Sequence, residues 1–414
     1  MAELSVDWRL TRLPNGMRLI TIARPGTPTV AVRVCVRAGS RYDVPPHLGL
    51  AHFTEHLLFK GTQSHSQREI YASVERLGGV LDAGTTKEYL TLYSVLPHQG
   101  LPTAINVLAG ILTQPALREE DFWEEKLVVL EEIRRAQDQQ SVIFDLFAET
   151  MWTAHPLRQP IVGTIEGLHK LEPDSLLSFY RQRFVTGNMV LAISGDLQHA
   201  EITQLVVQGF AGLPKGLDQP PDPVVEQPLE GQRSAHLEKG VHLTCLLLGV
   251  PTVGMKHRDR SAIKLMERVL GMGGSARLYQ RLREKEKLVY NVNTVTAHYE
   301  DAGYFAVHAA CAPQNLQAVR KVILEEWDKL RQRGATEDEI RAARSNFAGT
   351  LARRSETNIA LATAFGVQGL LYEVETLDQA VARINAVRRD DVQRVAQEYL
   401  DTERYVAATV GRAW

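Results

Sequence analysis

The sequence predicts an α+β fold of two tandem homologous domains, in each of which an antiparallel-type sheet packs against helices. Three observations support this prediction. The 414 residues exceed the usual size of one compact domain. Each half mixes strand patterns with long helical patterns, which is typical of sheet-and-helix layers. The end of the second half also repeats the end of the first. We expect domains at 1–216 and 233–414, joined by a linker at 217–232.

The first half alternates between strand and helix patterns. Alternating apolar and polar residues predict half-buried strands, and apolar residues at helical spacing predict helices. The predicted strands are Met17–Ala23, Thr29–Arg37, Val80–Thr85, Glu88–Leu96 and Met189–Ser194. The predicted helices lie within Leu48–Thr62 and at Gln67–Leu77, Gly100–Leu112, Glu119–Ala136, Val142–Trp152 and Asp174–Phe184.

A Pro- and Gly-rich segment separates this half from the second. Leu213–Arg233 is poor in large apolar residues, which is typical of a domain boundary. The strands predicted beyond it are His242–Val250, Val289–Thr296, Tyr304–Ala310 and Arg404–Val410. The predicted helices are Arg258–Leu270, Gln317–Arg333, Glu337–Arg353 and Asp390–Leu400.

The two halves end in the same helix-then-strand pattern. At one constant offset along the chain, Asp174 matches Asp390 and Gly195 matches Gly411, with apolar matches between them. A shared offset without gaps indicates an internal duplication.

Composition excludes several functional classes. The net charge of −2 predicts no bulk attraction to nucleic acid or to an anionic membrane. No apolar run reaches transmembrane length, and the start of the sequence has no leader pattern, so we expect a cytoplasmic protein. Cys35, Cys245 and Cys311 are scattered and lack metal spacing, so we expect reduced, buried thiols.

The motif that points to chemistry is His52-Phe53-Thr54-Glu55-His56. On a helix, positions i, i+3 and i+4 share one face, so both imidazoles can bind one metal ion beside Glu55. H-x-x-E-H is the inverzincin order of the zinc-peptidase motif. The second half lacks this motif, so we expect one metal site per chain.

A catalytic zinc site needs a third protein ligand, and a carboxylate on another helix is the natural candidate. The segment Glu124–Arg135 predicts such a helix, with Leu127, Leu130 and Ile133 on its buried face. Spacing alone leaves four candidates for the ligand: Glu124, Glu125, Glu131 and Glu132.

The segment His52–Gly61, followed by V-L-x-E-I, resembles the family of pitrilysin, insulin-degrading enzyme and mitochondrial processing peptidase. That family places its third zinc ligand, a glutamate, at a characteristic distance along the chain from the second histidine. The same spacing, counted from His56, implies Glu132 here. The family's supporting glutamate, seven residues earlier, matches Glu125. The resemblance also implies the family's duplicated α/β roll and a zinc ion as cofactor.

The same resemblance implies residues that bind the substrate. The strand that includes Asp82, Ala83 and Thr85 corresponds to the family's edge strand, which pairs with the peptide backbone. Asp82 stands where the family usually has asparagine. Arg283 and Tyr290 have the spacing of a family pair that grips the substrate and stabilises the tetrahedral intermediate.

We therefore predict a zinc metalloendopeptidase that acts on unfolded peptides or precursor segments. His52, His56 and Glu132 are the expected zinc ligands, and Glu55 is the expected general base. In the long single-chain members of the family, the half that holds the metal and the half that holds the Arg/Tyr pair face each other. This shorter chain is therefore expected to form a homodimer. A heterodimer with a sister chain and a catalytically inactive core or scaffold subunit are the alternatives.

Overall fold

The computed structural model describes residues 6–135 and 139–412. Its described residues form two compact units that are not contiguous in sequence. Unit 1 comprises 6–135, 159–222 and 352–376, and unit 2 comprises 139–158, 223–351 and 377–412. The predicted division at 217–232 places each sheet in its own half of the chain, but helical segments cross between the halves in both directions.

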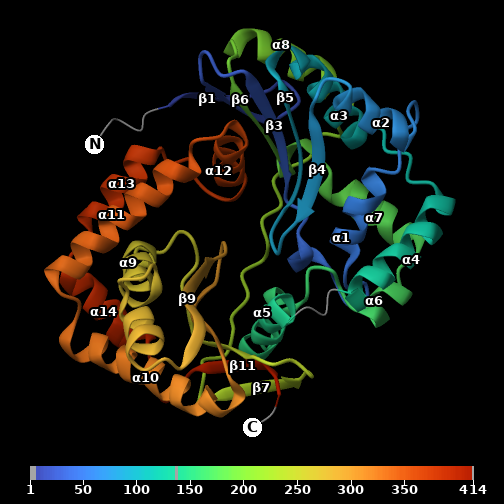
Figure 1. The fold of residues 1–414 in the computed structure, drawn as a ribbon. Helices are drawn as coiled ribbons and strands as arrows, with labels where there is room; N and C mark the ends of the chain where they lie inside the picture. The colour runs from blue at the N-terminus through green and yellow to red at the C-terminus, as the bar shows by residue number, and fades with distance from the viewer. Residues whose placement is uncertain (1–5, 136–138, 413–414) are drawn as a thin grey trace. The chain divides into compact units, whose positions relative to one another are not determined.

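Unit 1 is built on a six-stranded sheet with the order β1-β2-β6-β3-β5-β4 (Figure 1). Strands β2 and β6 are parallel, and every other neighbouring pair is antiparallel. The strands are β1 Asp7–Arg12, β2 Arg18–Ala23, β3 Thr29–Val36, β4 Val80–Thr85, β5 Leu90–Pro97 and β6 Met189–Gly195. Strand β4 forms one edge of this sheet, as predicted for the segment that includes Asp82.

Helices cover both faces of this sheet. One face packs on α1 and α3, whereas α12 crosses β3 and β6 on the other face (Figure 1). The helices are α1 Leu50–Leu58, α2 Gln67–Glu75, α3 Leu101–Thr113, α4 Glu119–Arg135, α6 Ile165–His169, α7 Pro173–Arg183, α8 His199–Gly209 and α12 Asn358–Leu371. The predicted helix end Ala136 lies outside the described residues.

Unit 2 contains a five-stranded sheet with the order β7-β11-β8-β10-β9. Helices α9, α10 and α14 cover one face and α5 covers the other. The strands are β7 Arg233–Glu238, β8 Thr244–Thr252, β9 Val289–His298, β10 Gly303–Cys311 and β11 Val406–Gly411. The helices are α5 Gln139–Met151, α9 Arg260–Gly271, α10 Leu316–Arg333, α11 Glu337–Arg354, α13 Leu377–Ala386 and α14 Arg389–Tyr399.

The predicted duplication is confirmed. The order β2-β6-β3-β5-β4 recurs as β7-β11-β8-β10-β9, with the parallel pair at the same place. Helices α7 and α14 begin and end at the predicted constant offset, and so do the last residues of β6 and β11. At Gly195 and Gly411 an added Cβ would meet the start of the neighbouring strand at about 3 Å or less, so both copies keep glycine there.

The predicted buried face of α4 is wrong in one position. Leu127 is 67% exposed, whereas Glu125 and Lys126 are buried. Lys126 donates to the carbonyl oxygens of Leu171 (2.8 Å) and His169 (3.1 Å), so its charge is satisfied inside the unit. A hydrophobicity pattern assigns charged residues to the solvent face. The predicted buried face of α4 was therefore rotated about the helix axis relative to the observed one.

Candidate metal centre

Helix α1 carries the H-x-x-E-H motif and is anchored by its apolar face. Phe53 and Leu57 are buried, and the ring of Phe53 meets that of Phe122 on α4 edge-on, with centroids 4.9 Å apart. The helix starts after Gly49, whose φ of 94° is left-handed. An added Cβ on Gly49 would lie 3.0 Å from the Cα of Gly163, so only glycine fits this turn.

Asp43, which was not among the predicted site residues, holds the first turn of α1. Its carboxylate accepts from the backbone N–H groups of Gly49 (2.8 Å) and Ala51 (2.9 Å). These groups have no partner within the helix, so a buried acceptor satisfies them. Burial raises the pKa of Asp43 to about 7, against the effect of its N–H donors. An aspartate a few residues before a glycine-started helix is the signal that would have identified it.

Replacing Asp43 with alanine is expected to destabilise unit 1 by about 1–3 kcal/mol, because two buried N–H groups lose their acceptor. Denaturant unfolding of Asp43→Ala against Glu201→Ala, which removes an exposed acid on α8, measures the loss. The folded-state pKa of Asp43 lies above its ordinary value of 3.8, so its contribution is largest at low pH and falls as the pH rises through about 7. Equal stability of Asp43→Ala and Glu201→Ala would contradict this role.

The three predicted metal ligands lie together. Glu132 Oε1 is 3.7 Å from His52 Nε2, and Glu132 Oε2 is 3.4 Å from His56 Nε2. The three ligand atoms lie within 4.8 Å of one another. Among the residues that the structure describes, this is the one cluster of His, Cys, Asp or Glu with such spacing. Two imidazole nitrogens and one carboxylate are the donor set of a catalytic zinc site, so the residues fit Zn²⁺.

The surroundings of His52 favour the neutral form of its imidazole ring, which is the form that binds a metal ion. Burial lowers the pKa of His52 to about 4, and the charge of His56 acts in the same direction. The ring is therefore neutral at pH 7, as a metal ligand must be. At His56, burial opposes the charged form, but the hydrogen bond and charge of Glu125 and the charges of Glu132 and Glu55 raise the pKa.

Glu125 occupies the predicted supporting place behind His56. His56 Nδ1 donates to Glu125 Oε1 over 2.7 Å, which leaves Nε2 of the same ring directed toward Glu132. Glu125 is only 5% exposed, and burial would raise its pKa. The hydrogen bonds and charges of His56 and Lys60 nevertheless lower it, so the carboxylate stays ionised. Such partners fix the tautomer and orientation of a metal-binding imidazole.

Lys60 forms an ion pair with Glu125 Oε2, so His56, Glu125 and Lys60 form a chain of polar contacts behind the expected metal site. No sequence pattern pointed to this residue. Lys60 lies two residues beyond the last residue of α1, so helical spacing does not place it, and its position depends on the contact with Glu125. A buried carboxylate needs a cation or several donors, and Lys60 supplies the charge.

Replacing Lys60 with methionine is expected to weaken zinc binding by about 10–100-fold, the usual cost of losing an outer partner of a metal ligand. Competition with a chromogenic chelator measures the affinity directly. Lys60→Arg should restore most of it, and Lys170→Met, which removes an exposed charge, should leave it unchanged. Equal zinc affinity in Lys60→Met and wild type would contradict the role of Lys60.

Glu55 lies between the two histidines along α1 and contacts the edge strand. Thr85 Oγ1 donates to Glu55 Oε2. Burial raises the pKa of Glu55, and the charges of Asp82 and Glu132 act in the same direction, against the hydrogen bond from Thr85. A carboxylate with a raised pKa holds a proton more readily than an ordinary glutamate, which suits a group that accepts and releases one.

The strand predicted as the substrate track is the free edge of the unit 1 sheet. Strand β4 pairs with β5 on one side, and in the described chain no strand pairs with its other side. Asp82 is exposed, Ala83 and Thr85 are half-buried, and α1 packs against this strand. The side chain of Thr85 is directed to Glu55, so its backbone is the part of this residue that would remain for a peptide paired with β4.

Arg283 and Tyr290 lie together in unit 2. Arg283 Nη1 donates to the backbone carbonyl oxygen of Tyr290 over 2.6 Å, and its guanidinium carbon lies 5.7 Å from the centroid of the Tyr290 ring. Tyr290 is 71% exposed, so its phenol is accessible. The structure thus brings the predicted pair together at the start of β9.

Unit 2 carries an altered copy of helix α1, the helix with the H-x-x-E-H motif. Helix α9 reads Lys264-Leu-Met-Glu267-Arg268, so cations take the place of both histidines. Glu267 Oε1 accepts from Thr296 on the edge strand β9, as Glu55 accepts from Thr85 on β4. Lys264 Nζ lies 2.8 Å from Glu267 Oε2. In the second copy, an ion pair between Lys264 and Glu267 stands where the first copy has His52 and Glu55.

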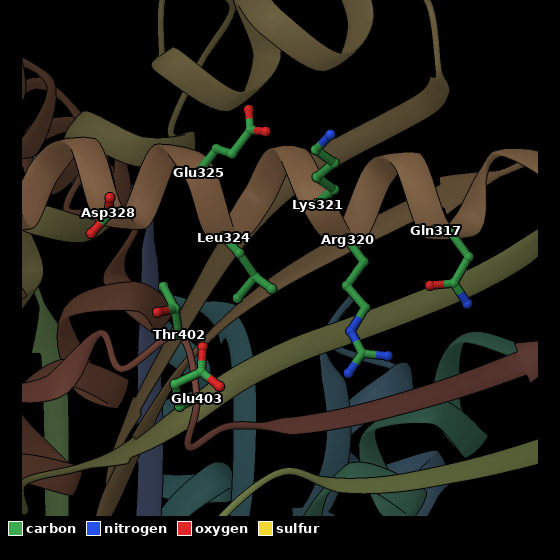
Figure 2. A pocket seen from close by; sticks show the side chains of 8 residues that line it. All are labelled: Gln317, Arg320, Lys321, Leu324, Glu325, Asp328, Thr402 and Glu403. Carbon is green, nitrogen blue, oxygen red and sulfur yellow. The ribbon is translucent and has the colours of Figure 1, made fainter.

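A pocket of about 460 Å³ lies elsewhere on unit 2, along α10 (Figure 2). Arg320, Lys321, Glu325 and Asp328 are among the residues that line it, so its lining carries charges of both signs. Arg320 already donates to the hydroxyl of Tyr405. None of the predicted site residues lines this pocket, and we assign it no part in the chemistry.

Comparison with protein families gives two adjacent matches. Residues 18–165 match the family model described as insulinase, peptidase family M16, and residues 170–347 match the peptidase M16 inactive domain. The altered helix α9 lies in the second match. Among the described residues no helix is both long and apolar enough to cross a bilayer.

Similar curated proteins extend over nearly the whole chain. An uncharacterized zinc protease of Streptomyces coelicolor is 32% identical over 401 residues, which cover 95% of this chain and 87% of that protein. The uncharacterized zinc protease YmxG of Bacillus subtilis is 29% identical, with 96% of each chain covered.

Solved structures share the fold. A protease from Helicobacter pylori superposes with a TM-score of 0.91 at 23% identity and covers 98% of this chain and 100% of its own. A Pseudomonas fluorescens structure named as a peptidase M16 inactive domain gives a TM-score of 0.90 at 19% identity, with 99% of both chains covered.

Proposed function

Because this chain belongs to peptidase family M16, the insulinase family, we propose that it is a zinc-dependent metalloendopeptidase acting on unfolded peptides or precursor segments. The observation that carries the proposal is the meeting of His52, His56 and Glu132 from two helices, with Glu55 beside them. An inactive scaffold subunit needs neither three metal ligands nor a general base, so the presence of all four residues favours an enzyme.

His52 Nε2, His56 Nε2 and a carboxylate oxygen of Glu132 would hold the zinc ion. When bound, zinc supplies an acidified water nucleophile at neutral pH and polarises the scissile carbonyl. Glu55 takes the proton of the attacking water on a carboxylate oxygen and passes it to the nitrogen of the departing amine. The donor Thr85 keeps one oxygen of Glu55 in place, so the other oxygen is free for this transfer.

Two further groups would bind the peptide. The free edge of β4 offers backbone N–H and C=O groups to an extended substrate, which aligns the scissile bond relative to α1. The exposed phenol of Tyr290 and the guanidinium of Arg283 would donate to the negative charge that develops on the carbonyl oxygen.

Digestion of a defined peptide mixture tests the proposed function. We expect zinc-loaded wild-type protein to cleave within peptides, and chelator-treated protein to cleave none, with products identified by mass spectrometry. Metal-free protein as purified, without hydrolysis after zinc addition, would favour the inactive scaffold subunit instead.

We also propose that two copies of this chain form the working enzyme. The metal ligands lie in unit 1 and the Arg283–Tyr290 pair in unit 2, and the long members of the family bring such halves face to face. In a two-fold homodimer, each subunit's pair would serve the other subunit's metal centre. A heterodimer in which a sister chain supplies the pair is the alternative.

Mixing two inactive variants tests the shared site. Glu55→Gln chains keep Arg283, and Arg283→Ala chains keep Glu55, so mixed dimers should regain up to one functional site in two. Activity after co-expression, with mixed dimers verified by two different affinity tags, measures the recovery. Verified mixed dimers that stay as inactive as the separate variants would contradict sites shared between subunits.

A further inference from the structure

Arg283 contacts two aromatic rings in unit 2, and Tyr279 is the ring outside the Arg/Tyr pair. The guanidinium carbon of Arg283 lies 5.4 Å from the ring centroid of Tyr279 and 5.7 Å from that of Tyr290. Tyr279 is the first residue of the short helix η5, Tyr279–Lys285, which also carries Arg283. A guanidinium at these distances is attracted to the ring by a cation–π interaction.

The ring of Tyr279 is held by the body of unit 2. It is half-buried and packs against the main core of this unit, whereas Tyr290 is 71% exposed. A Cβ added to Gly274 would lie 3.7 Å from Cε1 of Tyr279, so the glycine-rich loop before η5 passes close to the ring. Gln280 donates to the carbonyl oxygen of Gly274 over 2.6 Å and ties this loop to η5. Tyr279 is therefore the anchored ring of the two.

The charge of Arg283 is not neutralised by a carboxylate in the part of the chain that the structure describes. Arg281, two residues earlier, forms ion pairs with Glu325 and Glu326. Arg283 instead has its two ring contacts and one hydrogen bond, from Nη1 to the carbonyl oxygen of Tyr290. These contacts restrict a long side chain and leave its charge available to a negative group on a ligand.

The backbone around Arg283 is also unusual. Helix η5 is a π-helix, in which the N–H of Glu286 donates to the carbonyl oxygen of Arg281, five residues earlier. Such turns are rare and are frequent at functional sites. The chain then passes through Lys287, whose φ of 53° is left-handed, and returns so that the carbonyl oxygen of Tyr290 reaches Arg283. Strained residues of this kind cluster at functional sites, so both features support a functional role for the segment.

We propose that Tyr279 is a positioning residue for Arg283, whose guanidinium it holds in the place from which the transition state is stabilised. The inference rests on the proposed peptidase function and adds a residue to it. A free arginine side chain samples many rotamers, and only the fraction with the guanidinium in place acts on the substrate. An anchored ring raises this fraction before the substrate binds.

Steady-state hydrolysis of one peptide by the zinc-loaded full chain tests this role. Tyr279→Leu is expected to lower kcat by about three- to tenfold, between the exposed and the desolvated limits of a cation–π interaction. KM should change less, because Arg283 acts on charge that develops in the transition state. Tyr279→Phe should keep wild-type activity, since the ring remains and the hydroxyl of Tyr279 has no hydrogen-bond partner among the described residues.

A double-mutant cycle distinguishes positioning from a general packing effect. In an Arg283→Ala background, Tyr279→Leu should cause no further loss, because the ring has no guanidinium left to hold. Phe347→Leu is the matched control. It removes another half-buried ring of unit 2, which lies 4.9 Å from the guanidinium carbon of Arg268, and it should keep the wild-type kcat.

A second measurement does not depend on turnover. Nitrogen-15 relaxation of the Arg283 Nε–H group, identified by its absence from the spectrum of Arg283→Ala, reports how far this side chain moves. It should show a restricted side chain in wild type and in Tyr279→Phe, and a mobile one in Tyr279→Leu. The rest of the spectrum shows whether each variant is folded.

Full activity in Tyr279→Leu or in Arg283→Ala would overturn the positioning role and leave the peptidase proposal intact. So would an equal loss from Tyr279→Leu with and without Arg283, or an Arg283 side chain that stays restricted when the ring is removed. Zinc-loaded wild type that cleaves no peptide contradicts the proposed function itself, and the part of Tyr279 in catalysis falls with it.

Discussion

Glu55→Gln is expected to lower kcat by about 10²–10⁴-fold, the usual contribution of a general base, while the zinc content stays at one ion per chain. Glutamine has the size of glutamate and can still accept from Thr85, but it cannot take a proton from water. The loss should appear in kcat more than in KM, because Glu55 acts on the reacting atoms and not on the rest of the peptide.

Glu124→Gln is the matched control for this variant. Glu124 lies exposed on α4, next to the supporting Glu125. Wild-type turnover in Glu124→Gln beside a large loss in Glu55→Gln would assign the effect to proton transfer. A Glu55→Gln protein that keeps its zinc and cleaves peptides as fast as wild type would refute the mechanism.

Glu132→Ala is expected to abolish hydrolysis through loss of the metal ion. With two imidazoles left, zinc affinity should fall by more than the roughly 10–100-fold that the loss of a supporting partner costs. Metal analysis after dialysis should then find well under one zinc per chain. High added zinc should restore little activity, because the remaining site lacks its carboxylate.

Glu131→Ala separates this effect from a general change in α4. Glu131 is the neighbouring residue and is exposed, where it pairs with Arg134. It should retain both zinc and turnover. If Glu131→Ala lost zinc and Glu132→Ala kept it, the third ligand would be misassigned.

The sequence determines much of the fold because most elements have one apolar face. The constant offset between the two halves predicted their repeated ends, and α7 with β6 and α14 with β11 have this spacing. The sequence did not predict that α5, from the first half of the chain, packs on the sheet of unit 2, or that α12, from the second half, packs on the sheet of unit 1. A helical pattern specifies which side of a helix is buried, but both sheets offer an apolar face, so the pattern cannot choose between them.

Other elements were not predicted because their patterns are weak. Strand β1 is mostly exposed and has no buried residue, so it shows little apolar alternation. Helix α12 is apolar on nearly all sides, with glycines at 366 and 369 where it approaches β3 and β2, and glycine is usually a signal against helix. Strand β7 and helices α6, α8 and α13 were not predicted either.

The metal centre was predictable where spacing carries the information. His52, Glu55 and His56 lie within one helix, so their shared face follows from helix geometry. The expected third ligand lies on α4, and the helix pattern left four glutamates open until the family spacing implied Glu132. Lys60 and Asp43 were not predicted, because their roles depend on tertiary contacts. Lys60 contacts Glu125, and Asp43 contacts the first turn of α1.

Anomalous diffraction at the zinc edge, from crystals of the metal-loaded protein, tests directly whether His52, His56 and Glu132 bind zinc. We expect one strong peak per chain, within about 2.0–2.2 Å of His52 Nε2, His56 Nε2 and a carboxylate oxygen of Glu132. A peak at another place, or full zinc occupancy with Glu132 directed away from both imidazoles, would contradict the account.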